Sequence, residues 1–180
     1  MEKRQATAAE AKALANPLRL RILRLCLHEA LTNKELADRL DKDPGTLLHH
    51  VRTLVDTGFL AAEGVRSGAT GALEKPYRAT GKSWEVSVGD QPSSTAAQID
   101  ALRAEVLEAG DDPILAGFRL GIKLSAKRRK ELVAKIDALA EEYAFHDDPS
   151  GEPLGLYVVL HKRPRAARAS GRGGSAARGW

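Results

Sequence analysis

Cysteine is nearly absent from this 180-residue chain, and aromatic residues make up only 4% of it. The single cysteine, Cys26, excludes an intrachain disulfide, and its apolar helical surroundings favour a buried side chain. No apolar run reaches the roughly 18 residues that a membrane-spanning helix needs, and the first residues lack the apolar core of a secretory signal. We therefore expect a globular, cytoplasmic protein with no membrane partner.

Signatures of catalysis and of metal binding are also missing. The sequence contains no nucleophile elbow, no His-Glu-x-x-His pair and no paired acid with a nearby base. His49 and His50 are adjacent, so on a helix they point about 100° apart and rarely bind one ion. His146-Asp147-Asp148 offers hard ligands but equally suits a solvated helix end. We expect no enzyme activity, no cofactor and no metal site.

Acidic residues are missing from the end of the chain, where residues 162–180 hold six Lys/Arg and no Asp/Glu. Residues 1–82 hold 14 basic against 10 acidic residues, and residues 83–161 hold 8 against 14. A basic first segment suits a polyanionic partner, whereas an acidic middle segment does not. From Arg163 onward little apolar area is available to offset ordering entropy, so we expect a disordered basic tail that either binds nucleic acid or is inert.

The most informative stretch that the chain does have spans residues 43–58, which predict one short helix. Asp43 can cap it, Pro44 suits its first position, and Gly58 supplies the left-handed residue that ends it. Apolar residues follow the 3-and-4 spacing of a buried stripe. The opposite, polar face is formed by Gly45, Thr46, His49 and Arg52. Taken alone, this is an ordinary amphipathic helix with a solvated face.

Three further helices are predicted before this one. Residues 6–15 are alanine-rich and predict a close-packing helix, and Asn16-Pro17 opens a second helix that ends near His28. Thr32-Asn-Lys-Glu is a capping box that opens the third. The short link from it to Asp43 forces the two helices to cross steeply. Helix, tight turn and helix form the arrangement in which the second helix enters the DNA major groove.

After Gly58 the pattern becomes extended and predicts a hairpin of residues 59–66 and 74–80 around a glycine-containing loop. The loop lacks a Gly-Lys-Ser/Thr ending, so it does not indicate a nucleotide-binding loop. Placed after the recognition helix, Arg66, Lys75 and Arg78 can approach the DNA backbone or a minor groove, where cations are attracted.

Four segments in order, residues 14–23 (LANPLRLRIL), 36–40 (LADRL), 50–60 (HVRTLVDTGFL) and 75–80 (KPYRAT), resemble the winged helix-turn-helix of ArsR-like bacterial transcriptional regulators. The resemblance covers about residues 8–85. It implies a homodimer that represses transcription from a near-palindromic operator until an effector intervenes. It also implies that Pro44, Gly45, Thr46 and His49 face DNA and that His50 is partly buried. The helix after the capping box lacks the Cys-x-Cys ligand pair of the metal-sensing branch.

The second half predicts a small acidic α+β unit. Residues 84–88 alternate like a short strand, residues 91–95 resemble a Pro/Ser linker, and Ile99, Leu102, Val106 and Ala109 form an apolar helical stripe that stops at Gly110. Residues 118–124 and 154–160 alternate like half-buried strands, and Ser125 caps a long helix between them. Residues 114–124 are also compatible with a helical continuation.

We therefore expect a mainly α, α+β protein with three parts: a winged helix-turn-helix domain over residues 1–90, an acidic regulatory or dimerisation unit over 91–162, and the basic tail over 163–180. The expected function is a dimeric, sequence-specific regulator that binds double-stranded DNA, a repressor whose operator binding a small-molecule effector modulates. The alternatives are a winged-helix protein-interaction module without specific DNA binding, and an enzyme activity carried by the acidic unit.

Overall fold

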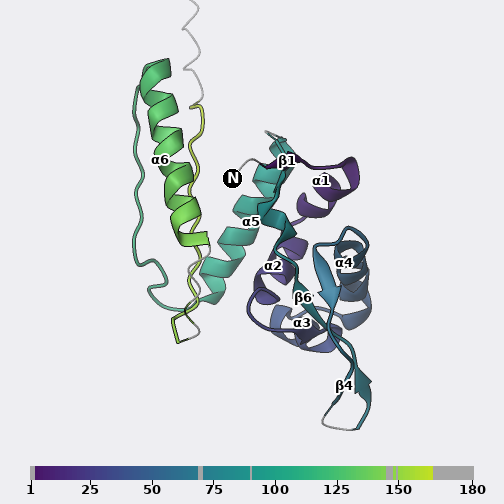
Figure 1. Ribbon diagram of the computed structural model, residues 1–180. Helices are drawn as coiled ribbons and strands as arrows, with labels where there is room; N and C mark the ends of the chain where they lie inside the picture. Colours follow the sequence, from purple (N-terminus) through teal and green to yellow (C-terminus); the bar gives the residue numbers. More distant parts are fainter. Residues whose placement is uncertain (1–2, 69–70, 90, 145–147, 149, 164–180) are drawn as a thin grey trace, which may run out of the picture. The chain divides into compact units, whose positions relative to one another are not determined.

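The computed structural model describes residues 3–68, 71–89, 91–144, 148 and 150–163. The chain divides into two compact units, residues 1–120 and 121–180. The helices of the first unit are α1 (Ala8–Leu14), α2 (Pro17–Leu25), α3 (Asn33–Leu40), α4 (Pro44–Asp56) and α5 (Pro92–Glu108), with the short 3₁₀ helix η1 (Lys82–Trp84) (Figure 1). The tail from residue 164, and His146 and Asp147, lie outside the described residues, so the predictions made for them stay untested.

The predicted starts of α2 and α3 are confirmed, whereas α1, predicted over residues 6–15, begins at Ala8; all three starts are set by local hydrogen bonds. Thr7 and Thr32 open α1 and α3 with capping boxes whose third helical residues are Glu10 and Glu35. The Asn16 side chain accepts a hydrogen bond from the backbone N–H of Arg19 at the start of α2. Of these helices, α2 ends at Leu25, three residues before the predicted end.

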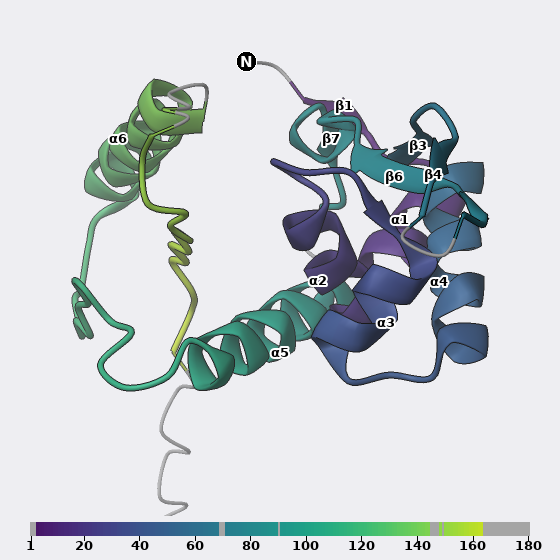
Figure 2. The same ribbon diagram turned by 90° about the horizontal axis from the view of Figure 1, so that it is seen from below.

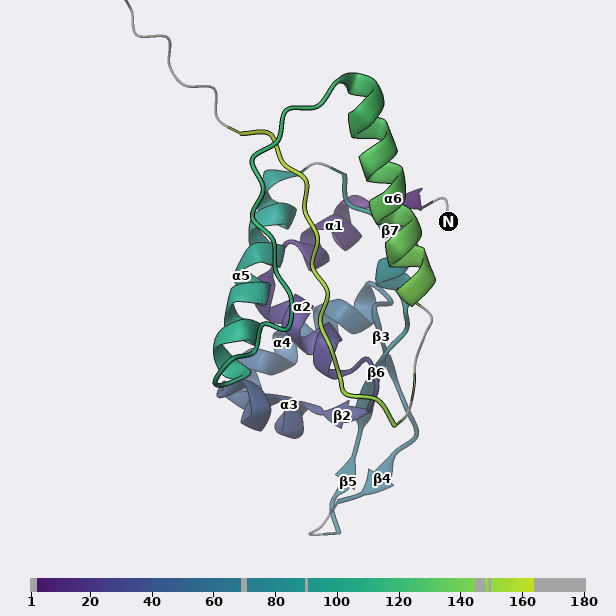
Figure 3. The ribbon, with the colours of Figure 1, turned by 90° about the vertical axis from the view of Figure 1, so that its left-hand side faces the viewer.

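The predicted hairpin is present but is split into two parts. β3 (Leu60–Ala62) pairs antiparallel with β6 (Pro76–Ala79), with Leu60 opposite Ala79, and β2 (Leu31–Thr32) pairs with the other edge of β6. Farther out, β4 (Arg66–Ser67) pairs with β5 (Leu73–Glu74) and extends the hairpin away from the helices (Figure 3). The short strands β1 (Arg4–Gln5) and β7 (Val86–Ser87) form a separate parallel pair.

The core lies where α1 to α4 meet the three-stranded sheet (Figure 2). Ile22 from α2, Leu36 from α3, and Leu47, Val51 and Leu54 from α4 are all completely buried. Phe59 and Leu60 close the core from the strand that follows α4. Each of these positions belongs to an apolar stripe or strand visible in the sequence, so the core of this domain follows from its hydrophobic pattern.

The expected Pro/Ser linker is wrong, because residues 92–95 form the first turn of α5. Pro92 occupies the first helical position, where no backbone N–H is needed, and Ser94 is buried. The buried face of α5 consists of small residues, Ser94, Ala97 and Ala101, whereas Ile99 from the predicted apolar stripe is 47% exposed. Small side chains let α5 lie close to α2, where Arg21 forms an ion pair with Glu108. The first compact unit therefore includes α5.

In the second unit α6 (Ala126–Ala144) begins after Ser125, as predicted, and the Ser125 hydroxyl accepts a hydrogen bond from the backbone N–H of Arg128. The two strands predicted at residues 118–124 and 154–160 are wrong, because these residues are extended but belong to no strand. Alternating apolar residues form a strand only where a neighbouring strand supplies backbone partners. No such partner is present among the described residues, although the chain as a whole is α+β as predicted.

Candidate nucleic-acid interface

The turn between α3 and α4 fixes where α4 begins. Asp41 adopts a left-handed conformation, with φ of 49°, and ends α3. Two residues later the Asp43 carboxylate accepts a hydrogen bond from the Thr46 backbone N–H at 2.8 Å. The Asn33 side chain donates to the Pro44 carbonyl oxygen at 2.8 Å, which ties the first turn of α4 to the first turn of α3. The helix-turn-helix therefore has a fixed geometry at its corner.

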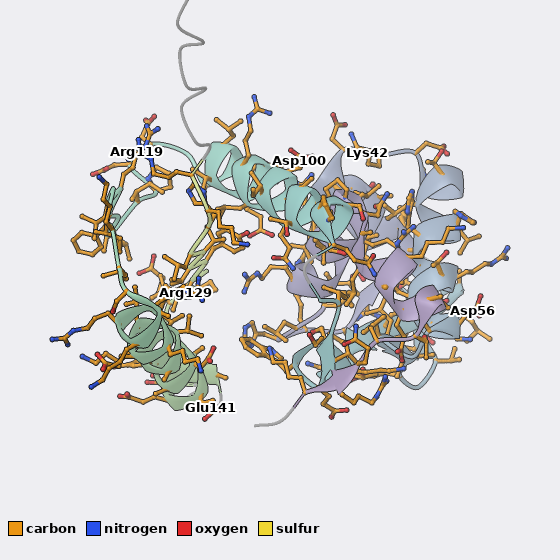
Figure 4. All side chains as sticks on the ribbon, turned by 90° about the horizontal axis from the view of Figure 1, so that it is seen from above. Lys42, Asp56, Asp100, Arg119, Arg129 and Glu141 are labelled. Atoms are coloured by element: carbon orange, nitrogen blue, oxygen red, sulfur yellow. The ribbon has the colours of Figure 1, made fainter. Side chains whose placement is uncertain are left out.

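One face of α4 is buried and the other is open. Leu47, Val51 and Leu54 are completely buried in the core. The five residues predicted to face DNA from this helix are all exposed: Pro44, Gly45, Thr46, His49 and Arg52. They lie between Lys42, which precedes α4, and Asp56, its last residue, both labelled in Figure 4. The structure thus brings the predicted recognition residues together on one solvent-facing surface.

His50 is partly buried, as the family resemblance implied, and it lies against Arg19. The Nη1 atom of Arg19 is 3.5 Å from the His50 Nδ1 atom. Burial, and next the positive charge of Arg19, lower the pKa of the His50 imidazole. Arg19 also donates from Nε to the Ala13 carbonyl at 2.6 Å and from Nη2 to the Lys12 carbonyl at 2.7 Å. One buried guanidinium therefore joins the end of α1 to the middle of α4.

The far end of α4 is held by a second cation. Lys82 donates from Nζ to the Thr57 carbonyl at 2.6 Å and lies 2.7 Å from the Glu10 carboxylate. Glu10 also accepts from Arg4, at 2.6 and 2.9 Å, and these hydrogen bonds, followed by that from Lys82, lower its pKa. Gly58 has φ of 74°, and a Cβ there would approach Lys82 Nζ to 3.1 Å. The positive φ favours glycine at this position, whereas the tip of the Lys82 side chain could shift to admit a Cβ.

The cations of the hairpin are placed differently from those of α4. Arg66 donates to Glu35 of α3 at 2.6 Å and to Glu74 of β5 at 3.3 Å, and the Glu35 contact is the main reason that its pKa is raised. Arg78 forms an ion pair with Glu63 and donates to the His28 carbonyl at 2.9 Å. Lys75 lies 5.9 Å from the centre of the Tyr77 ring.

Two of the three predicted hairpin cations therefore already have carboxylate partners in the protein without DNA. DNA phosphates would compete with Glu35 and Glu74 for Arg66, and with Glu63 for Arg78. Whether any of the eight predicted residues contacts DNA stays a prediction.

Sequence reasoning missed two residues that position the interface, Asn33 and Lys82. The sequence did contain a signal for Asn33. It is the first residue of α3, directly after the Thr32 cap, where a short amide side chain can reach the first turn of the next helix. No local pattern pointed to Lys82, because its partners Thr57 and Glu10 are 25 and 72 positions away in the sequence.

Other kinds of site receive no support from the described residues. Nowhere in that part of the chain do three or more His, Cys, Asp or Glu side chains gather in a way that would hold a metal ion. No helix among them is both long enough and apolar enough to cross a bilayer. Cys26 is buried, and burial raises the pKa of its thiol to about 12.

Comparison with solved structures gives several distant matches. HlyU from Vibrio cholerae, in its reduced form, is 22% identical over 51% of this chain and 80% of its own, with a TM-score of 0.34. A ZitR variant from Lactococcus lactis is 16% identical over 70% and 73%, with a TM-score of 0.33. The heme sensor PefR from Streptococcus agalactiae, bound to heme, is 15% identical over 79% and 83%, with a TM-score of 0.33. No curated protein matches the sequence.

Residues 14–62 match the family described as the helix-turn-helix domain. The match begins at the last residue of α1 and runs through α2, α3, α4 and β3. It thus includes the corner held by Asn33 and the whole exposed face of α4. The N-terminal part of this chain is a helix-turn-helix domain.

Proposed function

We propose that this protein is a dimeric transcriptional regulator that binds double-stranded DNA in a sequence-specific way and reads it with α4. The observation that carries the proposal is the open face of α4, backed by three completely buried residues within a helix-turn-helix match. A helix so supported can enter the major groove without disturbing the core. A protein that acts on DNA in this way would work in the cytoplasm.

On this surface Thr46 and His49 are the candidates for reading base edges. Both are exposed on the first two turns of α4, and a hydroxyl or an imidazole offers donors and acceptors that match the edges of bases. Pro44 and Gly45 add little bulk in the first turn and would let the backbone come close to the DNA. Arg52 lies two turns farther along and is placed for a phosphate.

The hairpin would supply contacts that hold the domain on DNA without reading its sequence. Arg66, Lys75 and Arg78 are assigned to phosphates or to a narrow minor groove. For Arg66 this involves exchanging the carboxylates of Glu35 and Glu74 for phosphate. Because these pairs are exposed, their exchange costs little.

Dimerisation, repression and effector control complete the proposal. One recognition helix reads few base pairs, so two copies on half-sites one helical turn apart are needed for useful specificity. Bound over a promoter, such a dimer would repress transcription. We assign the acidic residues 91–162 to the regulatory side, where an effector would change operator binding, because an acidic surface is repelled by phosphates.

The proposal is tested by mapping the DNA bound by the protein across a genome and then titrating the strongest site at several salt concentrations. Replacing Thr46 or His49 by Ala should cost ~1–3 kcal/mol on that site and leave binding to random DNA nearly unchanged. Asp56→Ala, at the far end of the same helix, is the matched control and should not weaken binding.

Two outcomes would contradict the proposal in different ways. If Thr46→Ala and His49→Ala lower affinity for the mapped site and random DNA equally, with a changed salt slope, other residues read the bases. If the protein shows no salt-dependent binding to duplex DNA, the domain is instead a protein-interaction module.

A further inference from the structure

The cations of the second unit are concentrated in two short stretches of its sequence. Residues 121–130 and 161–163 hold seven Lys/Arg and no Asp/Glu: Lys123, Lys127, Arg128, Arg129, Lys130, Lys162 and Arg163. Residues 131–160, which lie between these stretches, hold only Lys135 against seven Asp/Glu. The nearly balanced composition of residues 121–163 therefore hides a charge of +7 on one part and −6 on the other.

The fold brings these two stretches to the same end of the unit. Lys123 lies in the segment that leads directly into α6, which begins at Ala126. Residues 154–163 run back along α6 toward its start (Figures 1 and 3). A Cβ built at Gly121 would lie 3.0 Å from the Nη1 atom of Arg163, so this guanidinium lies against the segment before α6. The seven cations, all exposed, are called the basic end below.

This distribution of charge does not serve the stability of α6. Residues 127–130, all Lys or Arg, lie near its N-terminus, and Glu141 and Glu142 lie in its last turn. Cations at a helix N-terminus and anions at its C-terminus both oppose the helix dipole, so helix stability alone would favour the reverse order. An exposed ion pair of Arg128 with Glu131, at 3.1 Å, offsets little of this cost. A polyanion bound at the basic end would relieve it.

The surroundings of the basic end favour a nucleic acid over an anionic membrane. A membrane-bound surface combines cations with strongly exposed apolar side chains. In the segment after α6, Leu154 and Leu156 are 65 and 64% exposed, whereas Leu160, next to the basic end, is only 42% exposed. The most exposed apolar groups of this segment thus lie away from the cations. The sequence after Arg163 adds four further arginines and no acidic residue, which suits an extended chain of phosphates.

We propose that the basic end of the second unit binds phosphates of the same DNA duplex that α4 reads. The contact rests on the proposed function and adds to it a second surface that is indifferent to base sequence. Because the helix-turn-helix domain already holds the chain on the duplex, the basic end meets phosphates at a high effective concentration, so even weak contacts raise the affinity. The acidic residues of 131–160 then face away from the phosphates.

The test is titration of the full chain with the mapped site and with random duplex DNA, each at several salt concentrations. Arg129→Gln should reduce the slope of log K against log salt by about 1, and Arg129→Gln combined with Lys130→Gln by about 2. At about 0.15 M salt each lost contact should lower the affinity roughly 5-fold, equally for both duplexes. Arg129→Lys keeps the charge and should keep the slope.

Lys135→Gln is the matched control, because it removes one exposed cation from the acidic part of the same helix. A mere change in net charge would alter the slope for Lys135→Gln as much as for Arg129→Gln. Glutamine is a good helix former, and losing cations near the N-terminus favours α6, so weaker binding cannot result from a melted helix. Circular dichroism should show undiminished helix content in every variant.

The possible failures are distinguishable. If the double variant changes the slope no more than Lys135→Gln does, the inference is overturned while the proposed function stands. If that variant binds DNA normally but no longer sediments with phosphatidylserine vesicles that retain the unmodified chain, the partner is an anionic lipid surface and the inference is likewise overturned. An unmodified chain without salt-dependent binding to duplex DNA would overturn both the inference and the proposed function.

Discussion

Removing the buried guanidinium of Arg19 is expected to loosen the attachment of α1 to the rest of the helix-turn-helix domain. Arg19 is only 9% exposed, and it donates to the carbonyls of Lys12 and Ala13 at 2.7 and 2.6 Å. These carbonyls lie in the last turn of α1, where the helix itself supplies no partner. Arg19→Ala therefore leaves two acceptors without their donors.

The magnitude follows from those two hydrogen bonds. A hydrogen bond to a charged group contributes about 1.5–3 kcal/mol, and the desolvation of Arg19 that lowers its pKa offsets part of the sum. We expect Arg19→Ala to lower the free energy of unfolding by about 3 kcal/mol, which corresponds to a fall in Tm of roughly 10 °C. Arg19→Lys keeps the charge but not the planar fork, so its Tm should lie between those of Arg19→Ala and the unmodified chain.

The assay is thermal unfolding followed by circular dichroism, with Arg24→Ala as the control. Arg24 lies on the same helix, its side chain is 45% exposed, and its Nε atom is 3.8 Å from a Glu105 oxygen, so its loss should cost less than about 1 kcal/mol. A Tm for Arg19→Ala no lower than that for Arg24→Ala would refute the role given to the buried guanidinium.

Three other predictions concern titration, DNA binding and reactivity. The pKa of His50 is lowered in the folded protein, so its contribution to stability should be greatest above the ordinary histidine pKa and should be lost as the pH falls below it. His50→Gln should reduce this pH dependence in urea-midpoint measurements. Glu35→Gln together with Glu74→Gln releases Arg66, which should tighten binding to random DNA and steepen its salt slope by about 1; an unchanged slope would remove Arg66 from the phosphate contacts. Because burial raises the pKa of Cys26 to about 12, a thiol reagent should label it only as fast as the protein unfolds, and rapid labelling at neutral pH would contradict its burial.

The helix-turn-helix was predictable because its signals are local. Asp43 and Pro44 fix the start of α4, Gly58 fixes its end, and the apolar spacing of α4 selects its buried face. The exposed recognition residues follow from these same features. The pairing of Arg66 with Glu35 could not be predicted from the sequence. These residues are 31 positions apart, so their contact depends on how the hairpin and α3 are placed.

The predictions for the second half of the chain were wrong where packing, and not the period of the apolar residues, decides which face is buried. In α5 the spacing favoured burial of Ile99, but the face with Ser94, Ala97 and Ala101 allows a closer approach to α2 and is the one buried. The alternation in residues 154–160 predicted a strand, but alternation describes side chains and does not supply a hydrogen-bonding neighbour. Patterns that require a partner elsewhere in the fold, or in another molecule, cannot be completed from one sequence.

The hydrogen bonds at both ends of α4 restrict how this helix can move. The Asn33 amide holds the carbonyl of Pro44, and the Lys82 ammonium holds that of Thr57, so the helix is pinned to α3 at one end and to the segment after the hairpin at the other. Tilting α4 alone would break both bonds and open the core behind it. In the proposed dimer, the movement that breaks fewest contacts is instead a rigid-body shift of the two helix-turn-helix domains. The spacing between the two α4 helices would then no longer match the helical repeat of the duplex.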